Sequence, residues 1–325
     1  MLAAAVLNAD LGTRQLPIHP MSIRCSAVAP SPLEQLGVVD IEVDEAQSDT
    51  SEADRSTLKL DLLRIGAACS RGETATDADL AEARRAISML EDVNPTLEPA
   101  LASSCVGTWD LVFADTQLFR SSPFFMAGRA VCADGDEAAR YDWFCDMHRA
   151  ALAISNIGKV RQIVSTDTIT SEFEVSVGAV PFLSDALPFL RYSGGLPFEI
   201  TGAIVSSASI DTKSGDAWSL LMDTVEIKGS NIPLLRQVLD RGLNLQTRAL
   251  GGLLEQAVPE YANPTPAFTT TYLDDEVRVS KDQDGKLFVY ARVSDSTEPT
   301  DYTSRPSDLG LGQLLQGIAG QAGLV

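Results

Sequence analysis

The feature that most constrains the fold is a series of short strand-like segments after Cys105, separated by turns instead of long helices. Their apolar patterns predict strands at residues 106–113, 159–166, 169–177, 198–210, 217–228, 268–272, 276–280 and 286–293. Turn residues at 211–216 and 282–285 favour tight connections between neighbouring strands. Many antiparallel strands without strand–helix–strand alternation predict a closed or nearly closed barrel.

Two amphipathic helices precede the strands. The first begins at Ser56, carries an apolar face and ends at Gly72; the second opens at Thr76, with Asp79 at capping-box spacing. Asn94-Pro95 ends the second helix, because the residue before a proline disfavours helical geometry. Helical patterns also interrupt the strands at residues 137–155 and 233–257. The sequence thus predicts a mainly β fold: an antiparallel barrel at 105–293, a short helical hairpin at 56–104, and helical insertions.

The first residues have the composition of a targeting segment. Residues 1–33 contain a single acidic residue, Asp10, together with Arg14, Arg24 and scattered small residues. The short apolar opening has no preceding basic residue, so an organelle transit peptide fits better than a secretory signal. Residues 23–27 resemble a plastid processing site, which predicts a transit peptide at 1–25. The alternative is a merely disordered N-terminus.

An acidic segment follows. Residues 34–54 contain eight acidic side chains and no lysine or arginine. Because like charges repel and no large aromatic residue draws the segment into a core, we expect a disordered acidic linker at 26–55. A specific acidic docking tail is the alternative. At the other end, residues 294–325 are expected to form a flexible tail, since glycines interrupt an apolar pattern from 311 to 318.

Charge and residue counts exclude several function classes. With 25 basic and 45 acidic residues the net charge is −20, which disfavours nucleic-acid binding and electrostatic adhesion to anionic lipid. The five cysteines form no C-x-x-C motif, so free thiols are expected, with a single regulatory disulfide left open. No apolar run is long enough to predict a transmembrane helix. The glycine pairs at 194–195 and 251–252 lack a dinucleotide-binding context, and no cofactor is expected.

Catalytic and metal chemistry have weak support. The two histidines are His19, inside the expected transit peptide, and His148. Cys145 and His148 are spaced to share a helix face, but nucleophilic catalysis also needs an orienting group, and the spacing is common by chance. Asp142, Asp146 and His148 similarly make only a weak metal-site candidate. We therefore expect a protein that is not an enzyme and holds no metal.

Three segments resemble a known family. They are Gly107-Thr108-Trp109, Arg120-Ser121-Ser122-Pro123-Phe124-Phe125, and Thr270-Thr271-Tyr272-Leu273-Asp274-Asp275-Glu276-Val277-Arg278-Val279-Ser280. In this order they resemble the plastid lipid-associated proteins, also called fibrillins or plastoglobulins, over about residues 58–292. The stretch 126–229 matches less clearly, and 126–155 has the character of a subfamily insertion. The resemblance implies a lipocalin-like barrel that holds or surrounds an apolar molecule, and a location at plastoglobules, at thylakoids or in the stroma.

Aromatic residues give the first candidate site positions. Trp109 and Phe113 are candidates to line a ligand cavity, with structural core as the alternative. Phe124, with Phe125 and Met126, either dips into lipid or plugs the barrel end. Tyr272 either shapes a cavity mouth or belongs to a turn that Asp274 stabilises.

Two arginines complete the candidate site. Arg120 is a candidate to bind a polar head group, with a fixed loop at the barrel rim as the alternative. In lipocalins a basic residue on a late strand packs on the tryptophan of the first strand. Arg278 is the first choice for that position over Trp109, and Arg292 is the second.

These observations lead to two hypotheses of function. The first is a plastid binding protein that binds or shields an apolar small molecule, such as a quinone, carotenoid, tocopherol or acyl lipid. The second is a structural coat of plastid lipid globules without a bound ligand. In both, the expected partners are lipid and the stroma-facing surface of plastoglobules or thylakoids, attached peripherally, with no nucleic acid. The sequence does not specify protein partners.

Overall fold

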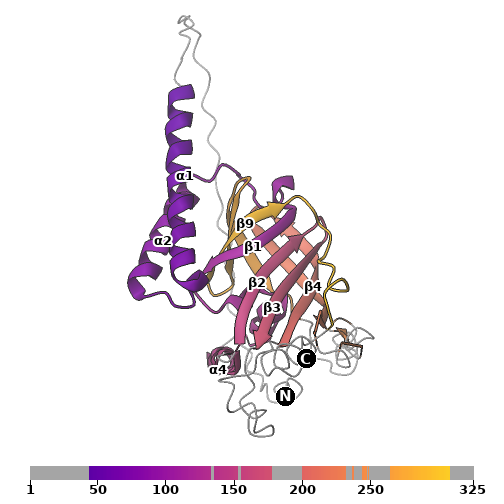
Figure 1. Cartoon of the computed structure of the whole chain (residues 1–325). Coiled ribbons are helices and arrows are strands. Elements are labelled where there is room, and N and C mark those ends of the chain that lie inside the picture. The colour runs from indigo at the N-terminus through magenta and orange to yellow at the C-terminus, as the bar shows by residue number, and fades with distance from the viewer. Residues whose placement is uncertain are drawn as a thin grey trace, which may run out of the picture. The chain divides into compact units, whose positions relative to one another are not determined.

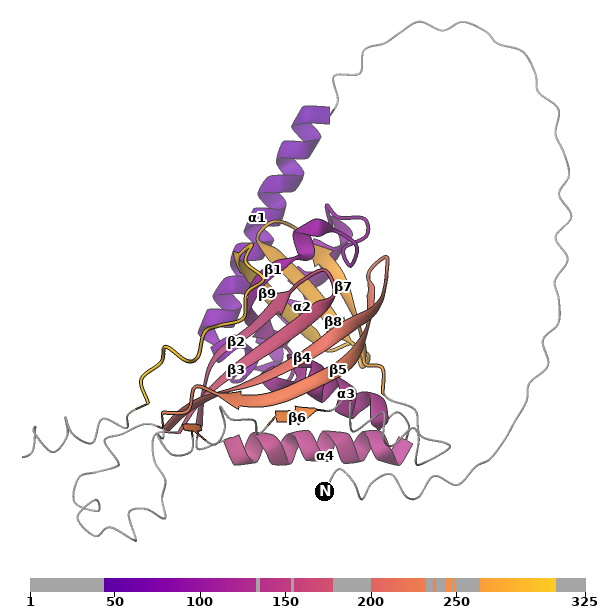
Figure 2. The same ribbon diagram turned by 90° about the vertical axis from the view of Figure 1, so that its right-hand side faces the viewer.

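A closed antiparallel barrel forms the centre of the protein (Figures 1 and 2). The computed structural model describes residues 44–132, 135–152, 155–177, 200–231, 236–237, 244–246, 248 and 264–307. Within these ranges one sheet has the strand order β4-β3-β2-β1-β9-β8-β7-β5-β6, and β4 also pairs with β5. Eight strands therefore close into a ring, and β6 pairs with β5 as an addition to it. The predicted barrel is confirmed.

The strands lie close to where the sequence patterns predict them. Their bounds are β1 (Gly107–Ala114), β2 (Ser155–Val164), β3 (Thr168–Val177), β4 (Ile200–Ser214), β5 (Ala217–Lys228), β6 (Asn244–Gln246), β7 (Ala267–Leu273), β8 (Val277–Asp282) and β9 (Leu287–Ser294). Each predicted segment overlaps one of the barrel strands. The β4–β5 connection is tighter than expected, because Ser214 already pairs with Ala217 and the turn needs only Gly215 and Asp216. Gly215 has a φ of 58°, which glycine adopts without strain.

Helices cover part of the outside of the barrel. Helices α1 (Asp44–Ala68) and α2 (Asp77–Asp92) are joined through a 3-10 turn at Ser70–Gly72. Thr76 and Asp79 form the predicted capping box at the start of α2. Apolar side chains of these helices pack with the outer face of strands β1, β7, β8 and β9; the buried members are Leu62, Cys69, Ala83, Ala86, Ile87, Leu90, Phe113, Tyr272, Val277, Val279, Leu287 and Val289. Both faces of these strands are therefore covered. This explains why apolar and polar residues do not alternate regularly along β1.

Helix α3 (Pro123–Val131) closes one end of the barrel. It follows β1 after the short 3-10 helix η4 (Leu118–Ser121). Ser122 caps α3 by accepting a hydrogen bond from the Phe125 amide at 3.5 Å. Phe125, Met126 and Ala127 are buried in the same cluster as the inward side chains of β1–β5. The prediction that residues 124–126 plug the barrel end, and do not dip into lipid, is confirmed.

Helix α4 (Gly135–Leu152) lies across the same end of the barrel, as Figure 2 shows. Tyr141 and Cys145 are buried toward the barrel cluster. On other sides of the helix, Trp143, Phe144 and Met147 are exposed, at 63%, 41% and 51%. Among the helices of the described ranges, none is both long and apolar enough to cross a membrane.

Three expectations about segment boundaries need correction. Helix α1 begins at Asp44, so residues 44–55 are helical and are not a disordered linker. The segment after β9 is not a free tail, because Tyr302 is only 4% exposed and packs against Ala203 and Val205 on the outside of β4. Inside the helix predicted at 233–257, residues 244–246 form β6 and most of the others lie outside the described residues, as do 1–43 and 308–325.

Polar contacts also hold the segment after β9 against β3. Glu172 on β3 accepts hydrogen bonds from the Thr300 amide at 2.8 Å and the Tyr302 hydroxyl at 3.2 Å. Arg305 stacks over the Tyr302 ring at 4.6 Å and pairs with Glu174. Composition cannot reveal these contacts, because they join residues that are far apart in the sequence.

Candidate functional site

The inner face of the barrel is the first candidate site. Its buried wall is apolar and rich in aromatic residues: Trp109, Leu111, Val160, Val164, Ile169, Phe173, Ala208, Trp218, Leu220, Met222, Phe268, Leu273, Phe288 and Tyr290. Trp218 on β5 and Phe268 on β7 stack with ring centres 5.3 Å apart. Because alternate residues of a strand point to opposite faces, β1–β5, β7 and β9 place these apolar residues inside the ring, whereas β8 turns Val277 and Val279 outward.

Two arginines contact the ring of Trp109. Its indole nitrogen donates a hydrogen bond to the Cys105 carbonyl at 3.0 Å, and the side chain is fully buried. The guanidinium carbon of Arg278 lies 5.2 Å from the indole ring centre, and that of Arg292 lies 4.2 Å from it. Both predicted partners therefore contact Trp109, and the second choice, Arg292, is nearer. Arg292 is also held by the backbone carbonyls of Val106 and Asp275.

Arg278 faces the interior of the barrel. It is fully buried and stacks over the Tyr290 ring at 4.4 Å. One of its nitrogens donates to Gln162 Oε1 at 2.5 Å, and another lies 4.0 Å from the Cys105 sulfur. Its neighbours Val277 and Val279 pack outward against the helices, so the strand alternation turns Arg278 inward.

Phe113 and Tyr272 do not line the interior. Both are fully buried against α1 and α2 on the outer face. The cause is a β-bulge in each strand: the register shifts between Leu111 and Phe113 on β1, and between Thr270 and Tyr272 on β7. A bulge adds one residue and reverses the face of everything that follows. The interpretation of Phe113 and Tyr272 as cavity-lining residues is therefore wrong.

The turn reading of the Tyr272 segment is confirmed. Asp274 Oδ1 accepts hydrogen bonds from the amides of Glu276 at 2.8 Å and Val277 at 2.7 Å. Its Oδ2 accepts one from the Tyr272 hydroxyl at 2.6 Å and one from Lys59 of α1 at 2.9 Å. Burial alone would raise the pKa of Asp274, but these hydrogen bonds lower it below the usual value. The carboxylate thus fixes the β7–β8 turn and ties it to α1.

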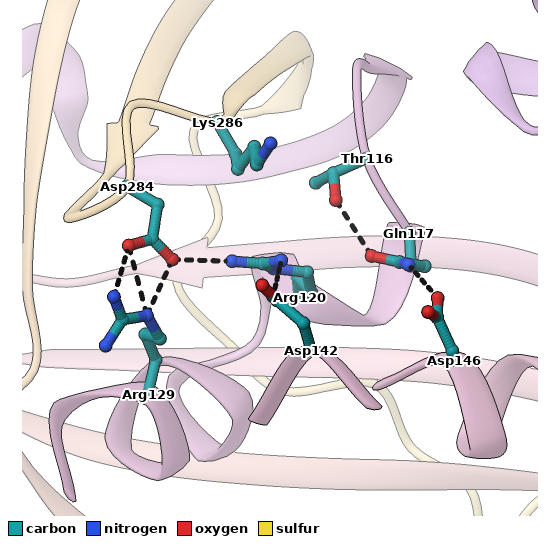
Figure 3. A pocket seen from close by; sticks show the side chains of 8 residues that line it. All are labelled: Thr116, Gln117, Arg120, Arg129, Asp142, Asp146, Asp284 and Lys286. Atoms are coloured by element: carbon teal, nitrogen blue, oxygen red, sulfur yellow. Dashed lines mark hydrogen bonds and ion pairs between the residues drawn. The ribbon is translucent and has the colours of Figure 1, made fainter. Parts of the chain in front are cut away.

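Arg120 joins the segment before α3 to the β8–β9 turn and to α4 at the plugged end (Figure 3). Its side chain is 4% exposed and pairs with Asp284 at 2.8 Å, and with Asp282 and Asp142 at 3.4 Å each. Its guanidinium also lies over the Tyr141 ring at 5.1 Å. Arg129 of α3 pairs with the same Asp284 carboxylate at 2.8 Å. The rim-loop reading of Arg120 therefore describes its contacts, while head-group binding stays a prediction.

A polar pocket opens beside this ion-pair cluster. Its volume is about 510 Å³, and its lining residues are Thr116, Gln117, Arg120, Arg129, Asp142, Asp146, Asp284 and Lys286. In Figure 3, Arg120 and Arg129 converge on Asp284, while Gln117 lies between Thr116 and Asp146. Three cations and three carboxylates balance in this lining. The pocket therefore suits polar groups, and it is not the apolar cavity that the ligand-binding hypothesis expects.

Phe124 occupies an intermediate position at the plug. It is half-buried against the barrel cluster and meets the Phe125 ring edge-on at 5.4 Å. On the neighbouring helix, His148 packs against Phe119 at 4.7 Å and Phe125 at 5.1 Å. Burial lowers the pKa of His148 and raises the pKa of Cys145, so both side chains are stabilised in their neutral forms. This arrangement does not supply the thiolate that nucleophilic catalysis requires.

Sequence reasoning did not identify several residues of the interior and its plugged end. Gln162 bridges Arg278 to the Ser121 carbonyl, which accepts from its amide at 2.8 Å. Tyr290 stacks on Arg278, and Asp282 accepts the amides of Asp284 and Lys286 at 2.9 Å each. The sequence does contain a signal for Gln162. It lies two residues from both Val160 and Val164, so it is a polar residue on an otherwise apolar, inward-facing side of β2.

Comparison with known proteins finds a family that part of the chain resembles. The sequence model of the family described as PAP_fibrillin matches residues 56–187, from the second half of α1 through β3, including 126–155. No curated protein and no solved structure gives a significant match. The matched range contains the Gly107–Trp109 and Arg120–Phe125 segments, and the closed barrel agrees with the lipocalin-like fold that the resemblance implies. Over residues 56–187 the chain is therefore similar to the fibrillin family of plastid lipid-associated proteins.

Proposed function

We propose that the barrel binds or shields an apolar small molecule, such as a quinone, carotenoid, tocopherol or acyl lipid. The observation that carries this proposal is the closed eight-stranded ring with an apolar, aromatic inner face. A small barrel of this kind has room for its own side chains or for one small ligand. Affinity would come from apolar area removed from water, at about 25 cal/mol per Å² before the costs of binding.

We place this role in the plastid, at the stroma-facing surface of plastoglobules or thylakoids. The similarity of residues 56–187 to the fibrillin family and the acid-poor residues 1–25, as a transit peptide, support the location. Residues 26–43 would then remain as an acidic spacer before α1. Attachment would be peripheral and independent of anionic lipid, because the net charge is −20. The proposed role requires no catalysis, in keeping with the neutral Cys145 and His148.

One observation favours a second function, a structural coat of plastid lipid globules. Large side chains already occupy the barrel interior, with Trp109, Phe288 and Tyr290 each fully buried. The exposed side chains of Trp143, Phe144 and Met147 on α4 offer a surface for lipid contact outside the barrel. In this alternative the protein covers lipid without enclosing any.

Solvent extraction of the full-length protein, purified in its folded form from plastids, distinguishes the two functions. The binding proposal predicts one apolar molecule per chain, found by mass spectrometry after extraction and retained through gel filtration. The matched control is the same protein unfolded in denaturant before gel filtration, which should lose the molecule. A folded protein that yields no stoichiometric lipid would contradict the proposal and favour the coat.

A further inference from the structure

Arg278 is a buried cation without an anionic partner. It is fully buried, and its contacts are Gln162, the Cys105 sulfur and the rings of Trp109 and Tyr290. Within the described part of the chain it forms no ion pair, and its Nε has no hydrogen-bond partner. Burying an unpaired guanidinium is costly, since an ion loses its hydration without gaining a counter-charge. By comparison, buried Arg120 has three carboxylates within 3.4 Å.

Arg278 belongs to a continuous polar belt on the inner wall. The strand register places Ser206 opposite Ser171, Ser171 opposite Gln162, and Tyr290 opposite Arg278. Gln162 then connects the two ends of this series through its bond to Arg278. All five side chains are 2% exposed or less. Facing strands bring such partners within side-chain reach of each other.

Two further atoms of this belt lack partners. The Ser171 hydroxyl and the Tyr290 hydroxyl are buried and make no hydrogen bond of normal geometry, although Tyr290 lies beside Gln162 and Ser121. Buried polar groups are nearly always paired, so three unpaired atoms in one belt indicate a missing polar group. All three are hydroxyl or guanidinium groups that can donate, and two of them belong to Arg278 and to Tyr290, which stacks on its positive charge. This favours an acceptor that is negatively charged.

We propose that the polar belt binds the carboxylate head of a single-chain acyl amphiphile whose tail lies along the apolar wall. This inference rests on the proposed function and deepens it, because it selects an anionic lipid among the apolar candidates. Arg278 and the Tyr290 hydroxyl donate to the carboxylate oxygens, and the Ser171 hydroxyl completes the shell. The stacked Trp218 and Phe268 and the neighbouring Phe288 form the wall for the chain. A carboxylate supplies the counter-charge that Arg278 lacks.

The head group is tested first on the wild-type full chain. Oleate, oleyl alcohol and oleylamine share one tail and carry a negative, neutral or positive head, and their affinities are measured by calorimetry. Oleate is expected to bind at least about tenfold more tightly than the alcohol, as a charge-assisted hydrogen bond predicts. Oleylamine is expected to bind most weakly, because it places a second cation beside Arg278. Acetate, the head without the tail, is expected to show no binding at the same concentrations.

Variants then assign the preference to Arg278. Arg278→Met should remove the oleate preference and leave the alcohol bound, and Arg278→Lys should retain part of the preference. Arg292→Met is the matched control, because Arg292 stacks on the same indole yet is paired with Asp295 and backbone carbonyls. It should leave the preference unchanged. Thermal unfolding checks that each variant is folded. If Arg278→Met does not fold, Tyr290→Phe replaces it in the test. This variant keeps the charge and should weaken oleate binding several-fold.

The outcomes separate this inference from the proposed function. Equal binding of oleate and oleyl alcohol by the wild type would overturn the carboxylate site and leave the apolar-ligand proposal standing. Acetate binding as tightly as oleate would also overturn it, since a free small anion would then fill the belt. Failure of the folded wild type to bind any of the three lipids would overturn both.

Discussion

Replacing Trp109 with alanine is expected to lower the free energy of unfolding by about 3–5 kcal/mol. The indole is fully buried, donates a hydrogen bond to the Cys105 carbonyl and contacts both Arg278 and Arg292. Its removal creates a cavity and takes away the indole surface that both guanidinium groups contact. Denaturant unfolding measures the change, which is large relative to the stability of an ordinary domain.

A double-mutant cycle tests the contact that this prediction assumes. Arg278→Ala should cost about 1–2 kcal/mol, and the double variant should cost less than the sum of the two, because the side chains touch. The same cycle with Arg292→Ala should also be non-additive, since Arg292 is nearer to the indole. Phe144→Ala, at a residue that is 41% exposed, is the control and should change stability by less than about 1 kcal/mol. An unchanged melting temperature in Trp109→Ala would contradict the placement of β1.

Replacing Arg120 with methionine is expected to destabilise the protein by about 3–5 kcal/mol at neutral pH. The change removes one partner of a buried ion pair and leaves the Asp282 carboxylate, only 6% exposed, without its cation. It also removes the ion pairs that connect η4 to the β8–β9 turn. Arg64→Met is the matched control, because Arg64 forms an exposed pair with Asp61 and such pairs contribute about 0–1 kcal/mol.

The pH dependence of the Arg120 variant gives a sharper test. Burial raises the pKa of Asp282 even in the wild type, where Arg120 opposes the shift. Without Arg120 the pKa rises further, so the folded state holds the proton more tightly than the unfolded state does. The destabilisation should therefore be largest above that raised pKa and shrink as the pH falls through it. A deficit that stays constant or grows on acidification would contradict the pairing of Arg120 with Asp282.

The strands could be predicted because their apolar segments are short and are separated by turn residues. The closed ring and the capping box at Thr76 follow the same local signals. The faces of Phe113 and Tyr272 could not be predicted, because each follows a β-bulge and local patterns do not mark the extra residue. Without the bulges, the period of two would place Phe113 on the same face as Trp109.

Polar contacts between residues far apart in the sequence could not be predicted either. The sequence marks Arg120 as a candidate, but for the segment that holds its partners Asp282 and Asp284 it predicts only a hairpin turn. The contact of Tyr302 with Glu172 likewise joins a supposed tail to β3. The sequence predicts that Arg278 packs over Trp109. It does not predict that Arg278 lacks a carboxylate partner, because that depends on which side chains the neighbouring strands bring to it.

The three tryptophans of the chain allow the central claim, that the barrel interior encloses an apolar molecule, to be measured directly. Trp109 and Trp218 face the interior and are at most 1% exposed, whereas Trp143 lies on α4 and is 63% exposed. Brominated acyl lipid quenches tryptophan fluorescence only at close range, so wild type and Trp143→Phe are titrated in parallel. Binding inside the barrel predicts that quenching persists in Trp143→Phe. Quenching that disappears with Trp143 would place the lipid on the surface and contradict the claim.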